Sequence, residues 1–95
     1  MLNLTRLKSN GSWNLVDLVA ITRDVLADYS TLALDQHVEL SMEVDAVRPV
    51  PVFGVEAAIR SAIANLIGNA LLHAHDARIV VARLDQEGGI AVNAA

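Results

Sequence analysis

The sequence predicts an α+β fold in which two helices lie on one face of a mixed β-sheet. Two segments, one beginning at Asn14 and one following Gly54, repeat apolar residues at the three- and four-residue spacing of a buried helix face. Residues 38–44 alternate apolar and polar side chains as half-buried strands do, and residues 78–84 are almost continuously apolar, as in a central strand. Ile90, Val92 and Ala94 alternate along a returning strand. Elements of these types favour a two-layer α/β sandwich.

The composition is very apolar for a short chain. The 95 residues make one domain or part of one, and 54% of them are hydrophobic. The mean hydropathy is +0.42. A chain of this length buries only about 60–70% of the surface that its unfolded form exposes. So much aliphatic material indicates a piece of a larger core, or a chain that buries the excess against a partner.

Charge and cysteine content exclude several classes of function. The formal net charge is −4 and the seven Lys and Arg residues do not cluster, so we expect no nucleic-acid partner. There is no cysteine, which excludes disulfides and thiolate metal sites. The longest uncharged run, residues 61–72, is too short to span a membrane, and the N-terminus lacks a secretion signal. We expect a soluble chain located in the cytoplasm.

The N-terminal third predicts a short lead and then a long helix. Residues 1–9 place leucines at helical spacing, and the segment 10–12 ends that pattern. Asn14 is a favoured N-cap, Asp17 completes a variant of the capping box, and Trp13 is placed to pack back as a hydrophobic staple. The expected apolar stripe of this helix consists of Leu15, Leu18, Val19, Thr22, Val25, Leu26, Tyr29 and Ala33.

The middle and the end of the chain predict a connector, the second helix and a hairpin. Residues 48–54 contain two prolines, so they form an edge strand or an extended connector, with Phe53 anchoring it on the core. Glu56 stands in the first turn of the second helix, where the helix dipole favours an acid. Gln86 to Gly89 supply the glycines of a turn between the last two strands.

Three polar side chains follow one another along the second helix. Asn65, Asn69 and His73 lie at positions i, i+4 and i+8, which places them one above another on one face. Asn is a poor helix former, because its amide competes for backbone hydrogen bonds. Either these side chains satisfy polar groups at the helix margin, or they face a cation or a phosphate chain. An Asn carbonyl oxygen suits a hard ion such as Mg²⁺.

The segment Asn-Leu-Ile-Gly-Asn-Ala-Leu-Leu-His at 65–73 resembles the N-box of the ATP-binding domain of sensor histidine kinases. These kinases share a superfamily with gyrase B and the Hsp90 chaperones, and the order of the surrounding elements is similar too. The resemblance implies a partial Bergerat-type fold that binds ATP and Mg²⁺. It implies that Asn69 coordinates the magnesium ion, while Asn65 and His73 line the phosphate side.

The resemblance also divides the chain and shows departures from the family pattern. It implies that residues 1–11 are the end of a dimerisation helix and a linker, and that 12–95 are part of the ATP-binding domain. Val55 stands where the family usually has an acidic N-cap, and Leu72 where it commonly has a lysine that meets the phosphates. Residues 90–95 resemble the strand that leads into an Asp-x-Gly-x-Gly box, and the sequence stops before that box.

These departures lead us to expect a kinase fragment with reduced function. Nucleotide binding is expected to be weak or lost, and phosphoryl transfer by the isolated chain is not expected, because catalysis depends on positioning and charge neutralisation around the nucleotide. The implied partners are the nucleotide and either the rest of the kinase or a response regulator.

Other readings of the sequence remain open. The apolar excess and an exposed last strand also favour a non-enzymatic interaction or dimerisation module, including a homo-oligomer that pairs through a sheet edge. A metal site at His73, His75 and Asp76 is weakly indicated, because residues two apart on a helix point in different directions. Hydrolase chemistry is indicated even less, because the following serines lack a nucleophile-elbow context: Ser12, Ser30, Ser41 and Ser61.

Overall fold

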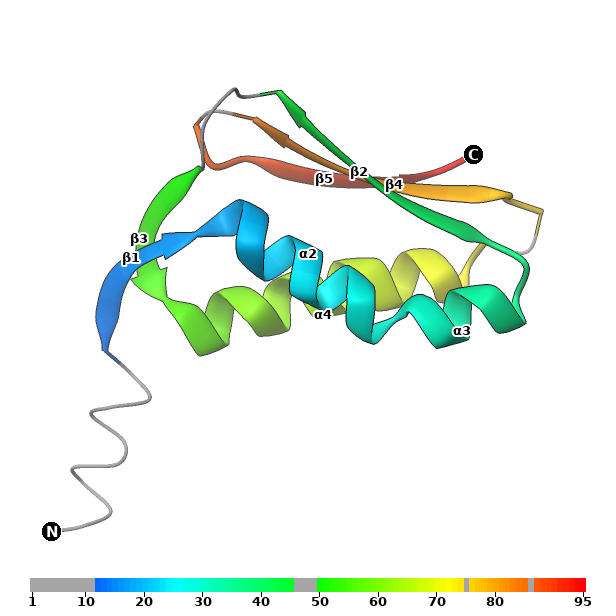
Figure 1. Ribbon diagram of the computed structural model, residues 1–95, viewed down its shortest axis with the longest axis horizontal. Helices are drawn as coiled ribbons and strands as arrows, with labels where there is room; N and C mark the ends of the chain where they lie inside the picture. The colour runs from blue at the N-terminus through cyan, green and yellow to red at the C-terminus, as the bar shows by residue number, and fades with distance from the viewer. Residues whose placement is uncertain (1–11, 46–49, 75, 86) are drawn as a thin grey trace, which may run out of the picture.

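The computed structural model describes residues 12–45, 50–74, 76–85 and 87–95. Its elements, in chain order, are β1 Trp13–Asp17, α2 Leu18–Asp28, α3 Ser30–Asp35, β2 Glu39–Asp45, β3 Pro51–Val55, α4 Glu56–Leu72, β4 Ile79–Asp85 and β5 Ile90–Ala94. The helices lie along one face of the sheet formed by β2, β4 and β5, and the β1–β3 pair stands at one end (Figure 1). The predicted α+β sandwich is confirmed.

The main sheet has the strand order β2-β4-β5. Strands β2 and β4 are parallel, with Glu39 opposite Ile79, whereas β4 and β5 are antiparallel, with Leu84 opposite Ile90. The turn between β4 and β5 is held by Asp85, whose Oδ1 accepts hydrogen bonds from the backbone N–H groups of Glu87 at 2.9 Å and Gly89 at 2.8 Å. The predicted hairpin is therefore present.

The predicted start of the first helix at Asn14 is wrong. The segment Trp13–Asp17 is strand β1, which pairs antiparallel with β3 from Trp13 opposite Val55 to Asp17 opposite Pro51. Helix α2 begins at Leu18, and its N-cap is Asp17, whose Oδ1 accepts a hydrogen bond from the N–H of Val19 at 3.0 Å. A cross-strand partner far along the chain thus overrides the capping signal at Asn14. It also removes Leu15 from the helical stripe, and this side chain is exposed.

The long first helix that the sequence predicts is interrupted at Tyr29, where the backbone angles are φ −94° and ψ 1°. Within the part of the chain that the structure describes, three helices, α2, α3 and α4, therefore stand where two were expected. The apolar stripe nevertheless continues across the break, since Val25 on α2 and Ala33 on α3 are both buried. The break interrupts the helix without changing the face that it buries.

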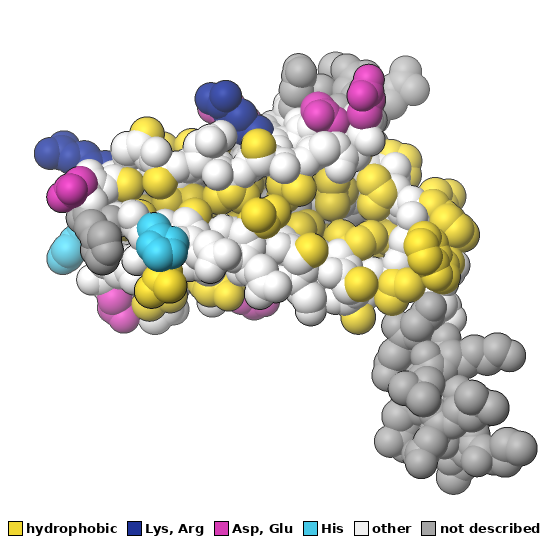
Figure 2. Space-filling model, turned by 180° about the vertical axis from the view of Figure 1, so that it is seen from behind, with side chains coloured by type: hydrophobic (Ala, Val, Ile, Leu, Met, Phe, Trp, Pro, Cys, Tyr) yellow, Lys and Arg dark blue, Asp and Glu magenta, His cyan; other side chains and the backbone are white. Residues whose placement is uncertain are grey.

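The core lies between the helices and the three-stranded sheet. Helix α4 begins where it was expected, after Val55, which makes no side-chain capping hydrogen bond. The buried residues that α4 contributes are Ile63, Ile67 and Leu71. Thr22 is also fully buried, and its hydroxyl donates to the carbonyl oxygen of Leu18 at 2.8 Å. On the opposite side from the view of Figure 1, a band of hydrophobic side chains remains visible at the surface (Figure 2).

Trp13 and Phe53 do not pack into this core as the sequence predicted. Trp13 is 63% exposed and Phe53 is 65% exposed, and their rings contact each other with centroids 5.6 Å apart. Both side chains belong to the β1–β3 pair, which forms a sheet of its own at the end of the molecule. The predicted staple and anchor are therefore wrong, because this ribbon packs its two aromatic rings on each other instead.

The expectations for the helical lead at 1–9, for His75 and for the start of the proline-containing connector (48–49) concern positions outside the described residues.

Candidate functional site

Asn65 and Asn69 occupy the outer side of α4, opposite the residues that it buries. Their positions are exposed, whereas Ile63 and Ile67 are buried against the sheet. The two asparagines are one helical turn apart, so their side chains lie next to each other along the helix. A helix buried on one side thus presents two adjacent amides to solvent.

A groove runs beside these amides, between α4 and the α2–α3 segment. Its volume is about 360 Å³, and it is lined by Tyr29, Leu32, Gln36, Ala64, Asn65, Gly68, Asn69 and Leu72. The side chains that can hydrogen-bond are the amides of Gln36, Asn65 and Asn69 and the phenol of Tyr29. The groove therefore combines neutral donors and acceptors with an apolar floor.

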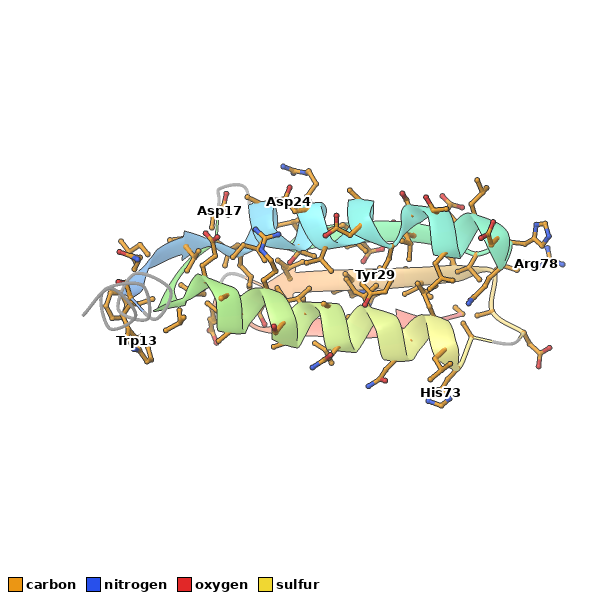
Figure 3. The ribbon with its side chains drawn as sticks, turned by 90° about the horizontal axis from the view of Figure 1, so that it is seen from below. Trp13, Asp17, Asp24, Tyr29, His73 and Arg78 are labelled. Atoms are coloured by element: carbon orange, nitrogen blue, oxygen red, sulfur yellow. The ribbon has the colours of Figure 1, made fainter. Side chains whose placement is uncertain are left out.

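The close approach of Tyr29 to α4 depends on Gly68. A Cβ atom at Gly68 would lie 3.0 Å from the Tyr29 hydroxyl oxygen and 3.5 Å from Cζ. In Figure 3 the Tyr29 side chain lies between the two helices. The glycine inside the 65–73 motif thus makes room for the tyrosine at the end of α2.

His73 is not brought together with the two asparagines as the sequence predicted. Helix α4 ends at Leu72, and His73 is its C-cap, with φ −103° and ψ 9°. The N–H of His73 donates to the carbonyl oxygen of Asn69 at 3.1 Å, but the exposed side chain is not among those that line the groove. Figure 3 shows it at the end of α4, on the other side of the helix from Tyr29. Of the three side chains that the sequence places in one row, only Asn65 and Asn69 therefore line the groove.

No charged side chain lines the groove. Arg60, which stands earlier on α4, is engaged with acids, at 3.5 Å from Asp24 and 3.9 Å from Glu56. Leu72 stands where the family that the sequence resembles commonly has a lysine, and its exposed side chain lines the groove. An anion bound here would meet amide dipoles and a phenol, and it would need a cation of its own to neutralise it.

Local sequence patterns do not identify the groove's hydrogen-bonding residues Tyr29 and Gln36. The pattern places Tyr29 only in the apolar stripe and gives no signal for Gln36, because both residues come from a different part of the chain than the motif. Gly68 was the available signal, since a glycine in a helix interior often marks a close approach by another group.

The described residues offer no support for the metal site suggested at His73, His75 and Asp76. Within the described residues, no three or more His, Cys, Asp or Glu side chains converge as metal ligands, and His75 lies outside those residues. In the same part of the chain, no helix is long and apolar enough to cross a membrane.

Comparison with known proteins finds similarity in structure but not in sequence. The sequence matches no protein-family model and no curated protein. The cytoplasmic segment of histidine kinase QseC is similar with a TM-score of 0.71 and 17% identity, over 87% of this chain and 56% of that one. The catalytic domain of histidine kinase ThkA in a nucleotide-free form is similar with a TM-score of 0.71 and 15% identity, over 78% of this chain and 50% of that one.

A third similar structure is histidine kinase AdeS from Acinetobacter baumannii, with a TM-score of 0.64 and 19% identity, over 86% of this chain and 42% of that one. ThkA is also similar in its complex with the response regulator protein TrrA, with a TM-score of 0.70 and 14% identity, over 88% of this chain and 28% of that one. The chain thus spans about half the length of the first two of these structures. Over most of its own length, this chain has the fold of the catalytic domains of histidine kinases.

Proposed function

We propose that this chain is part of a two-component sensor histidine kinase and that its α4 groove is the phosphate side of a Mg-nucleotide site. The observation that carries the proposal is the pair of exposed amides, Asn65 and Asn69, on the helix whose sequence resembles the N-box, in a chain with the fold of kinase catalytic domains. In this proposal residues 12–95 belong to the ATP-binding domain.

The donor set fits a magnesium ion that arrives with a nucleotide better than a free ion. Mg²⁺ takes oxygen ligands and keeps several waters, and it is commonly held by one or two protein groups together with substrate phosphates. Asn69 supplies one neutral carbonyl oxygen, and no carboxylate lines the groove. We therefore assign Asn69 to the ion, Asn65 to the adjacent phosphate oxygens, and His73 to the same phosphate side, reached from the end of α4.

The bound magnesium ion would supply the positive charge that the groove lacks. The residues of this chain would orient the phosphates by hydrogen bonds from amide N–H groups. Because no lysine or arginine lines the groove, we propose weak nucleotide binding and no phosphoryl transfer by the isolated chain.

The partners and location in this proposal follow from the similar structures. ThkA is known in complex with a response regulator, and the QseC structure is a cytoplasmic segment. We propose that the protein from which this chain comes acts in the cytoplasm on a response regulator.

Calorimetric titration with Mg-ADP tests the site directly. We expect measurable heat for the 95-residue chain and at least about tenfold weaker binding for Asn69→Ala, because a hydrogen bond or ligand to a charged group is lost. Asn14→Ala is the matched control, since Asn14 is an exposed amide on β1 outside the groove. Free Mg²⁺ should give no heat. Equal binding by Asn69→Ala and Asn14→Ala would reject the assignment of Asn69.

A second candidate function is a non-enzymatic interaction module. It is favoured by strand β5, which forms one edge of the main sheet among the described residues and carries no charged side chain. Such a module would be indifferent to nucleotide and would change its oligomeric state with concentration.

A further inference from the structure

The hydroxyl group of Tyr29 has no hydrogen-bond partner among the described residues. The backbone N–H of Tyr29 donates to the carbonyl oxygens of Val25 and Leu26, whereas its side chain forms no hydrogen bond there. The residue is half-buried, and no polar side-chain atom of the described residues is both buried and unbonded, so the hydroxyl oxygen reaches solvent. Tyr29 lines the α4 groove. Its phenol is therefore a donor that is available to a ligand in that groove.

Room for this hydroxyl requires a glycine in the middle of α4. A Cβ atom at Gly68 would lie 3.0 Å from the hydroxyl oxygen, but 3.5 Å and 3.6 Å from the two nearest ring carbons. Phenylalanine at position 29 would thus leave space for alanine at position 68, and alanine is the better helix former. The hydroxyl adds no protein hydrogen bond that would offset this difference. Departures from the locally favoured residue are expected at functional sites. Packing alone therefore does not explain the tyrosine.

Asn65 lies next to Gly68 on the surface of α4. Residues three apart on a helix have Cβ positions about 5–6 Å apart, so the Asn65 side chain lies beside the place that the Tyr29 hydroxyl occupies. Asn69 lies about one helical turn further along. Both amides line the groove, and neither forms a hydrogen bond with another described residue. A phenol O–H and an amide N–H therefore line the same part of the groove.

These two donors suit an oxygen anion. Tyrosine and asparagine both donate hydrogen bonds, and hydrogen bonds to a charged acceptor are stronger than those between neutral groups. Leu32 and Leu72 supply apolar surface in the same groove. A less polar surrounding strengthens hydrogen bonds further. None of the lining residues belongs to the main sheet, so both walls that would hold the anion are helical segments.

We propose that Tyr29 is a further ligand-binding residue of the Mg-nucleotide site, and that its hydroxyl donates a hydrogen bond to the phosphate group that Asn65 contacts. This inference rests on the proposed function and adds a residue to it. The phosphate is then held from both walls of the groove, by Asn65 on α4 and by Tyr29 at the junction of α2 and α3. Asn69 remains the ligand of the magnesium ion. The break between α2 and α3 thus takes part in ligand recognition.

Gln36 is the other hydrogen-bonding residue on the same wall, and it does not carry the inference. Its position is exposed, and holding its long side chain in one conformation on a ligand costs entropy. Tyr29 has only two side-chain torsions, so a phenol is ordered at low entropic cost. Its ring already lies between the two helices (Figure 3). The tyrosine is therefore the preorganised donor of this wall.

Calorimetric titration with Mg-ADP tests the phenol through Tyr29→Phe, which removes one oxygen atom and keeps the ring. We expect about tenfold weaker binding, because a hydrogen bond to a charged group is lost. The midpoint of urea unfolding should stay the same, because the hydroxyl forms no hydrogen bond with the described residues. Loss of affinity without loss of stability distinguishes a binding residue from a packing residue.

Ser30→Ala is the matched control, because it removes the hydroxyl of the neighbouring residue. The Oγ atom of Ser30 donates to the carbonyl oxygen of Ala27 at 2.7 Å, and Ser30 does not line the groove. This variant should bind Mg-ADP like the unmodified chain. Equal binding by Tyr29→Phe and Ser30→Ala, with weaker binding by Asn69→Ala, would overturn the role of Tyr29 and leave the Mg-nucleotide site intact. No binding by the folded, unmodified chain would overturn both proposals.

The signal of the tyrosine itself provides a second measurement. The chain contains one tyrosine, so a sample labelled with ¹³C at the tyrosine Cζ atom gives one resonance from that atom. We expect saturating Mg-ADP to shift this resonance, because the oxygen bonded to Cζ then donates to a phosphate. Ser30→Ala should show the same shift. A Cζ resonance that stays in place while calorimetry shows bound Mg-ADP would overturn the proposal.

Discussion

At the scale of single residues, the contact between Gly68 and Tyr29 shapes the candidate site. Glycine in a helix interior costs about 1 kcal/mol relative to alanine. A Cβ atom at this position would lie 3.0 Å from the tyrosine hydroxyl oxygen, which is a close contact. The ring carbon that bears the hydroxyl would be 3.5 Å from the same Cβ, which is an ordinary contact distance. The hydroxyl, and not the ring, is therefore the atom that disfavours a larger residue.

This contact predicts that the effect of Gly68→Ala depends on residue 29. In the unmodified chain, the gain in helix propensity is offset by crowding, so we expect the free energy of unfolding to stay the same or fall by about 1 kcal/mol. In a Tyr29→Phe background the same substitution should raise it by about 1 kcal/mol. Urea unfolding of the four variants measures the coupling, and equal effects in both backgrounds would show that the hydroxyl contact is unimportant.

At the scale of elements, the first helix shows how much the sequence determines locally. Asn14 and Asp17 both carry N-cap chemistry, and local patterns alone favoured Asn14. The choice was made by β3, which pairs with residues 13–17 and leaves Asp17 as the cap. By contrast, α4 and the β4–β5 hairpin were predicted correctly, because their periodicity and turn residues are local.

Removing each candidate cap tests this assignment. We expect Asp17→Ala to lower the free energy of unfolding by about 1 kcal/mol, because the N–H of Val19 loses the carboxylate that accepts its hydrogen bond at 3.0 Å. Asn14→Ala should change it by less than about 0.5 kcal/mol, as for other exposed sites. Chemical denaturation compares the two, and a larger loss for Asn14→Ala would place the helix start where local patterns put it.

At the scale of the whole molecule, one face of α4 carries the core, while its neighbouring face lines an apolar furrow of about 440 Å³. Ile67 is 0% exposed and Leu66, the preceding residue, is 41% exposed. A chain of 95 residues has a free energy of unfolding of only about 5–14 kcal/mol, so the contribution of a single core side chain is a large share of it. The same helix therefore combines a residue needed for folding with an apolar neighbour that remains at the surface.

Truncating these two neighbours separates a core position from a surface position. We expect Ile67→Ala to lower the free energy of unfolding of the monomer by about 2–5 kcal/mol, through lost burial and the cavity left behind. Leu66→Ala should cost less than about 1 kcal/mol, because much of this side chain is already exposed. Chemical denaturation compares the two variants; a Leu66→Ala chain as unstable as Ile67→Ala would place Leu66 in the core.

The sequence by itself determined the α+β class, the start of α4, the β4–β5 hairpin and the motif that places two amides on α4. These features depend on spacing along the chain, which is local. Only the tertiary structure decided that residues 13–17 form a strand, that Tyr29 and Gln36 join Asn65 and Asn69 in one groove, and that His73 stays outside it. Those outcomes depend on contacts between distant segments, whose energies no local pattern contains.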